Sequence, residues 1–422
     1  MSVRESLQKI RHGFHSTFWV ANITELFERL AYYGPQAVLA IYLHEHLNLS
    51  SEQTTWLIGY YGFVVWFMPV IGGTLADRFG FRRTLAGAFM ILAIGNFLLG
   101  SLSAPWMGAV RDALPLFGLM HLLMLIPAMG PAVVKPVVVG TTAHAAKEEV
   151  RSIGYSIYYT IVNIGAALGP IVASIVRKSV GVEDVFLVSA GTTLTMAVVT
   201  LIFYREPVRE PGRRVTRMSD AFVNLFRVLM NPRFVIFLLI FSGFWVMFWQ
   251  QYLSLPIFIR DYVNPNADVD RLLAVEATTV ITLQFVVTFL TRKIPAFSAM
   301  IAGVLISSLS FLILTFGAST GYIVAALVVL AVGEVTQAPR YYEYVSRLAP
   351  PDQQGLFMGY AFLPVGIGYL IGGRLAGSLL HHYGEVQHTP SAMWYIVSGV
   401  GLLTTVLMIV YNRIARPGGI RQ

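Results

Sequence analysis

The chain consists of long apolar runs separated by short polar connections. Each run is long enough for a helix that crosses the hydrocarbon core of a bilayer, which takes about 20 predominantly apolar residues. The pattern therefore predicts an all-α membrane protein with twelve transmembrane helices. The runs lie at residues 18–43, 54–76, 84–103, 114–140, 152–176, 185–204, 233–259, 272–291, 296–317, 321–345, 355–380 and 391–412.

Composition supports the class of membrane protein and limits the kinds of site that the chain can hold. Hydrophobic residues make up 56% of the chain and charged residues only 12%, against about 25% charged in a soluble domain. No cleavable signal peptide is expected, because residues 1–17 are polar and the first apolar run is too long for one. There is no cysteine, and the nine histidines show no metal-ligand spacing. We therefore expect no disulfide, no metal and no cofactor.

Basic residues predict the orientation. If the N-terminus is cytoplasmic, the inner connections hold 21 of the 30 Lys and Arg residues and the outer ones hold 5. The positive-inside rule then places both termini in the cytoplasm of a multi-pass protein of the plasma membrane, the inner membrane in a bacterium. The same bias explains the net charge of +8, so the lipid bilayer is the expected partner and nucleic acid is not.

The longest polar stretch divides the apolar runs into six and six. Residues 1–204 are expected to form an N-terminal six-helix bundle and residues 233–422 a C-terminal one. Residues 205–232 would be a basic cytoplasmic linker, with a short amphipathic helix at Ser219–Met230 on the membrane surface. Two such bundles meeting at a central cavity are typical of secondary transporters.

The connection between the second and third runs reads GGTLADRFGFRRTLAG, residues 72–87. It resembles the signature loop of the major facilitator superfamily, with Phe81 shifting the pattern by one residue. The resemblance implies the superfamily fold, which is monomeric. It also implies that an aspartate caps or pairs across a helix end while arginines contact the cytoplasmic face. The matching residues are Gly73, Asp77, Arg78, Arg82 and Arg83.

Three charged residues interrupt the first apolar run. Glu25, Glu28 and Arg29 have the spacing i, i+3 and i+4, so they share one helix face, which Tyr32 and Tyr33 extend by a turn. Facing lipid, the three charges would cost roughly 8–10 kcal/mol at about 2.5–3.5 kcal/mol each. The face must therefore point into protein or a wet cavity.

Later runs supply further polar groups. They carry a cation, amides and a carboxylate, namely Lys135, Asn163, Gln250, Gln251 and Glu334. A cavity that is positive on one wall and negative on the other suits a zwitterion with separated ends.

These segments resemble the proton-coupled oligopeptide transporter family. The first run matches its E-x-x-E-R-F-x-Y-Y-G motif with Leu30 in place of phenylalanine, and the later matches are Lys135-Pro136, Asn163 with Gly165, and Gly333-Glu334 with Pro339. The resemblance implies import of di- or tripeptides, or peptide-like zwitterions, with protons by alternating access. Proton coupling is implied for Glu25, Glu28, Arg29, Lys135 and Glu334. Substrate binding is expected of Arg29, Tyr32, Tyr33, Trp66, Lys135, Asn163, Trp249, Gln250 and Glu334.

The chain also departs from that family. Trp249 stands where the family has a seventh-run glutamate, which removes one protonatable group, and Trp66 stands where it has a tyrosine. Aromatic residues here would favour bulkier cargo than ordinary dipeptides. Two alternatives stay open: a proton-driven exporter or carrier of another small organic or amphipathic molecule, and a non-transporting membrane sensor. No nucleophile–base pair or nucleotide-binding loop is present, so neither an enzyme nor an ATP-driven pump is expected.

Some intramembrane charges fall outside these motifs. Arg340 and Glu343 are expected to pair locally at the end of the tenth run. Arg374 has two alternatives: a pair with Glu276 of the eighth run, or a place in the outer vestibule.

Overall fold

The structure is a computed structural model that describes residues 13–69, 78–206, 230–291, 293–348 and 359–414. In these residues ten helices are long and apolar enough to cross a membrane. Two more stand at the positions of the first two apolar runs: α2 (Ser16–Ile41), which carries the three charges, and α3 (Ser51–Phe67). The prediction of an all-α, multi-pass membrane protein is confirmed.

The chain divides into two compact units. The first comprises Met1–Gln36 and Met68–Ala221 and the second Ala37–Phe67 and Phe222–Gln422. Most of α2, up to Gln36, thus belongs to one unit, while its end and α3 belong to the other. The division into bundles at residues 1–204 and 233–422 stays a prediction, and most of the linker, with its amphipathic segment, lies outside the described residues.

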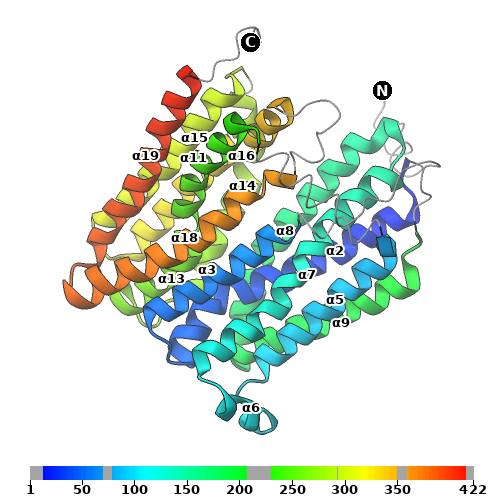
Figure 1. Ribbon diagram of the computed structural model, residues 1–422, viewed down its shortest axis with the longest axis horizontal. Coiled ribbons are helices and arrows are strands. Elements are labelled where there is room, and N and C mark those ends of the chain that lie inside the picture. The colour runs from blue at the N-terminus through cyan, green and yellow to red at the C-terminus, as the bar shows by residue number, and fades with distance from the viewer. Residues whose placement is uncertain (1–12, 70–77, 207–229, 292, 349–358, 415–422) are drawn as a thin grey trace. The chain divides into compact units, whose positions relative to one another are not determined.

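In the first unit, α5 packs against α7 and α9, and α8 packs against both of these helices (Figure 1). Buried apolar side chains from α2, α5, α7 and α9 form its core, for example Ala21, Phe89, Val137 and Ala197. The helices other than α2 are α5 (Phe81–Gly100), the short α6 (Gly108–Ala113), α7 (Leu116–Ala145), α8 (Arg151–Ser179) and α9 (Val182–Phe203).

Small residues let α8 approach α2 very closely. A Cβ atom on Gly165 would lie 2.4 Å from Cβ of Arg29, and one on Gly169 would lie 2.9 Å from Cβ of Tyr33. Contacts under 3.0 Å leave no room for a side chain, so glycine is required for this approach. Stripes of small residues are the usual means of close helix packing in membranes.

In the second unit, α15 packs against α16 and α19, α14 against α16, and α11 against α18 and α19. The segment from α11 to η4 is long enough to span as a whole. The elements are α11 (Pro232–Phe248), α12 (Gln250–Leu253), α13 (Leu255–Phe258), η4 (Ile259–Val263), α14 (Val269–Thr291), α15 (Ala296–Leu312), η5 (Ile313–Thr315), α16 (Thr320–Leu348), α18 (Leu363–Leu379), η6 (Leu380–Val386), η7 (Pro390–Ala392) and α19 (Met393–Ile414).

Helix α3 packs against α18 in this unit. The contact is again made by glycines: a Cβ on Gly59 would lie 3.0 Å from Cα of Gly373, and one on Gly373 would lie 2.5 Å from the carbonyl oxygen of Thr55. Helix α3, from the N-terminal part of the chain, therefore packs with a helix from its C-terminal part.

Candidate functional site

The charged turn of α2 is buried. Glu25 and Glu28 have no exposed surface and Arg29 is 2% exposed. The Arg29 Nε atom donates to Glu28 Oε2 over 2.5 Å and lies 3.4 Å from Glu25 Oε1. The expected polar face thus exists, and Arg29 pairs with both carboxylates and offsets one of their two negative charges.

Helix α7 brings a second cation to this turn. Lys135 is partly buried and interacts electrostatically with Glu25, Glu28 and Arg29, and Tyr158 of α8 lies close to Glu25. Three helices therefore contribute to one cluster, which we call the α2 charge cluster: Glu25, Glu28, Arg29, Lys135 and Tyr158. Its two carboxylates and two cations balance, so a proton on a carboxylate, or an anion from outside, would compete for a cation.

Neighbouring residues of the first unit extend the cluster. The guanidinium of Arg29 lies 5.2 Å from the ring centre of Tyr32, a cation–π contact, and the rings of Tyr32 and Tyr33 meet edge to face. Asn163 donates its side-chain amide to the carbonyl of Tyr159 on its own helix. Sequence reasoning did not find Tyr158, because nothing in the spacing of residues places it beside Glu25.

The second unit holds an aromatic cluster, which we define as Trp66, Trp245, Trp249, Phe362 and Tyr369. Trp249 stacks on Tyr369 with ring centres 4.1 Å apart and on Trp245 at 5.4 Å. Trp66 lies 6.3 Å from Trp249 and 5.8 Å from Phe362. The indole nitrogens of Trp245 and Trp249 are buried and have no hydrogen-bond partner among the residues that the structure describes.

The amide of Gln250 is already engaged. Its nitrogen donates to the carbonyls of Val246 and Gly372, and its oxygen accepts from the Ser254 hydroxyl. It ties α12 to α18. By contrast, neither atom of the buried Gln251 amide has a hydrogen-bond partner in the described part of the chain.

Glu334 of α16 lies beside Glu276 of α14, with the two carboxyls within hydrogen-bond reach. Arg374, which the sequence offered as a partner for Glu276, instead lies over the ring of Trp56 at 5.6 Å. Arg340 does pair locally with Glu343, over 2.8 Å, as expected.

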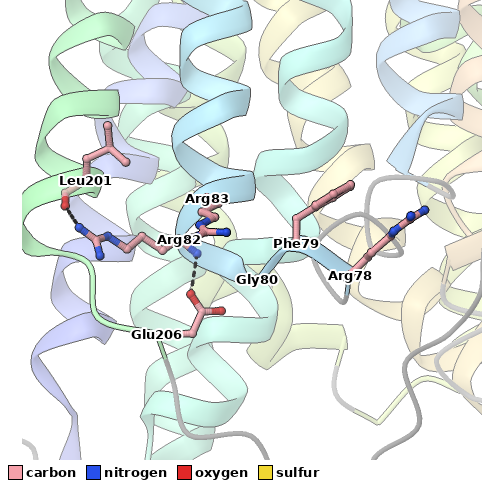
Figure 2. Close-up of a pocket in the computed structure, with 7 residues that line it drawn as sticks. All are labelled: Arg78, Phe79, Gly80, Arg82, Arg83, Leu201 and Glu206. Atoms are coloured by element: carbon pink, nitrogen blue, oxygen red, sulfur yellow. Dashed lines mark hydrogen bonds between the residues drawn. The ribbon is translucent and has the colours of Figure 1, made fainter.

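The signature loop is described only from Arg78 onward; Gly73 and Asp77 lie outside the described residues. Figure 2 shows the Glu206 carboxylate, which accepts from the backbone nitrogen of Arg82 at the start of α5. It also accepts from the backbone nitrogen of Phe81. The Arg82 side chain donates to the carbonyl of Leu201. Arg82, Leu201 and Glu206, together with Arg78 and Arg83, line a hollow of about 610 Å³. The loop therefore fastens α5 to the end of α9.

A polar network closes one end of the second unit. Arg260 binds the Glu45 carboxylate with two hydrogen bonds of 2.5 and 2.6 Å. His44 contacts Asp261 at 3.1 Å, and Glu385 accepts from Ser51 and contacts His381. Three π-helical turns carry most of these groups: η1 (Tyr42–His46), η4 and η6. We call this the outer network, after the side on which the sequence places it.

Helices of membrane-spanning length, buried charges and a facilitator-type loop define a membrane transporter. A sequence profile of the Major Facilitator Superfamily matches residues 22–266 and 253–421. The chain belongs to that superfamily of transporters, and not to a family of enzymes.

The chain is similar to known proteins in two ways: in sequence to the relatives named first, and in fold to the solved structures named after them. The multidrug resistance protein MdtH of Photorhabdus laumondii is 21% identical over 87% of each chain, and MdtH of Aeromonas salmonicida is 23% identical over 81% of this chain and 82% of its own. A POT family transporter in complex with 5-aminolevulinic acid matches with a TM-score of 0.77 at 17% identity, covering 95% of this chain and 96% of its own. The nucleoside transporter NupG matches at 0.78 and 14%, covering 94% and 99%. At these identities the structures show a shared fold.

Proposed function

We propose that this transporter imports di- or tripeptides, or peptide-like zwitterions, together with protons. The observation that carries the proposal is the α2 charge cluster: an arginine held between two buried carboxylates, with a lysine from α7 beside them. Such a cluster responds to both cargo and protons, because a substrate carboxylate and a proton each weaken a pair between a carboxylate and a cation.

Glu334 is a second group that suits a zwitterionic substrate. It is a partly buried carboxylate of the second unit, and a substrate amino group is the cation that it would receive. Solved structures of the same fold hold 5-aminolevulinic acid, a thioalcohol-conjugated peptide and alafosfalin. Protons would be the coupling ion and no cofactor would be needed.

The test is uptake into proteoliposomes. The purified protein is reconstituted, an inward proton gradient is imposed, and peptides of different size compete with a labelled dipeptide. We expect gradient-dependent uptake that Glu28→Gln and Lys135→Gln reduce at least tenfold, a loss of about 1.4 kcal/mol. Lys178→Gln, a basic residue at the exposed end of α8, is the matched control and should transport normally. Absence of gradient-dependent uptake, or wild-type rates in Glu28→Gln, would reject the proposal.

A second candidate function is proton-driven export of aromatic or amphipathic molecules. The aromatic cluster favours it, because Trp249 stacks where a carboxylate would otherwise receive a proton. The relatives named multidrug resistance proteins point the same way. The same proteoliposomes separate the two: an exporter extrudes a cationic dye when protons flow inward and ignores dipeptides. High-affinity transport of alanine dipeptides would contradict the expectation of bulky cargo.

A further inference from the structure

Two carboxyl groups meet inside the second unit. Helix α14 packs against α16, and Glu276 and Glu334 lie within hydrogen-bond reach of each other across this contact. Glu276 is only 6% exposed, and its Oε1 atom is buried with no donor among the described residues. Glu334 is partly buried.

Two ionised carboxylates cannot make this contact. An ionised carboxylate only accepts hydrogen bonds, so a hydrogen bond between two of them requires a proton on one. Two negative charges within hydrogen-bond reach of each other in a buried environment also repel strongly. The usual result is that the pair holds one proton.

The arginines of α16 and α18 have other contacts. In the part of the chain that the structure describes, neither Glu276 nor Glu334 forms an ion pair with Lys, Arg or His. Arg374 lies over Trp56, and Arg340 and Arg347 both contact Glu343. A proton is therefore the available ligand that neutralises the pair.

We propose that Glu276 and Glu334 form a proton-binding site that holds one shared proton between α14 and α16. The site supplies a protonatable group in the second unit, where Trp249 occupies the position expected to carry one. Its role in coupling rests on the proposed function: a substrate amino group that binds Glu334 would displace the shared proton, or confine it to Glu276. The presence of the proton does not depend on transport.

Infrared spectroscopy tests the site directly. Difference spectra of the protein in lipid between two pH values report the carbonyl band of protonated carboxyl groups. We expect the wild-type protein to show a band from this pair with a defined midpoint, separate from any band of the α2 charge cluster. Glu276→Gln should leave Glu334 with an amide donor, so that it binds a proton more than about tenfold more weakly and the midpoint moves down by more than about one pH unit. Glu334→Gln should alter the frequency or midpoint of the band that remains.

The controls make the outcome decisive. Asp270→Asn removes another buried acid of α14 and should leave the band unchanged. Glu276→Asp retains an acid, and its band reports the site if Glu276→Gln fails to fold. An unchanged midpoint in Glu276→Gln, or an unchanged band in Glu334→Gln, overturns the shared proton whatever is transported. A shared band without any peptide uptake supports the site and rejects only the proposed import.

Proton counting then tests coupling. In proteoliposomes that import peptide, Glu276→Gln should carry fewer protons per substrate than the wild-type protein and Asp270→Asn the same number. An unchanged ratio in Glu276→Gln would overturn the coupling role.

Discussion

Arg29 is the residue that joins the buried carboxylates of the α2 charge cluster. It touches both buried carboxylates of its own helix and a tyrosine ring one turn on. Its charge is almost fully buried, so the two glutamates depend on it for neutralisation.

Replacing Arg29 by glutamine should destabilise the protein strongly. Removing one partner of a buried ion pair costs about 3–5 kcal/mol, because the other charge stays buried alone. Arg347→Gln is the matched control: its salt bridge with Glu343 involves a side chain that is 62% exposed, and exposed pairs contribute at most about 1 kcal/mol. The measurement is the free energy of unfolding in detergent micelles, and equal losses in the two variants would contradict the expectation.

At the scale of elements, the α2–α8 contact places the charge cluster. Gly165→Ala should push the two helices apart, since the new Cβ would lie 2.4 Å from Cβ of Arg29. Overpacking of this kind costs typically about 1–3 kcal/mol. Gly191→Ala on α9 is the control, because a Cβ there meets nothing within 4 Å. Thermal unfolding compares the two, and a Gly165→Ala protein as stable as Gly191→Ala would show that the approach is not tight.

The π-helical turn η1 makes stability depend on pH. The hydrogen bond from His44 to Asp261 raises the pKa of His44 above its ordinary value. The pair therefore adds stability that is fully present below the ordinary histidine pKa of about 6.5 and is lost as pH rises through the raised pKa. The melting temperature of His44→Gln should lie below that of the wild-type protein at acidic pH, and the gap should close at alkaline pH. A gap for His44→Gln that grows with pH would have the wrong sign.

At the scale of the whole molecule, the outer network joins the chain's beginning to its second half. Transport by alternating access requires contacts of this kind to break and re-form. Glu45→Arg should repel Arg260 and slow transport, while the double variant Glu45→Arg/Arg260→Glu should restore much of the rate because the pair is rebuilt in reverse. Because the chain has no cysteine, single cysteines near this end can report its opening by labelling rate. A double variant as slow as the single one would mean that the pair acts in another way.

Sequence reasoning located several site residues because their chemistry is costly in lipid. Glu25, Glu28 and Arg29 stand out in an apolar run, and their spacing alone places them on one buried face. Arg340 and Glu343 are three residues apart, so local geometry predicts their pair. Glu276 could not be assigned in this way, since two acids on distant helices carry no sign of contact in the sequence.

The sequence alone determined the helical membrane class, the number of apolar runs and the buried face of the first run. It did so through hydrophobic periodicity, the distribution of basic residues and the free-energy cost of charge in lipid. These properties depend on local composition and on the solvent, so the sequence carries them by itself. Tertiary structure decided which groups meet: Lys135 and Tyr158 beside Glu25, Trp249 on Tyr369, Arg374 over Trp56, and Glu276 against Glu334. Such contacts join residues from different helices, and the order of residues along the chain does not fix which faces of those helices pack together.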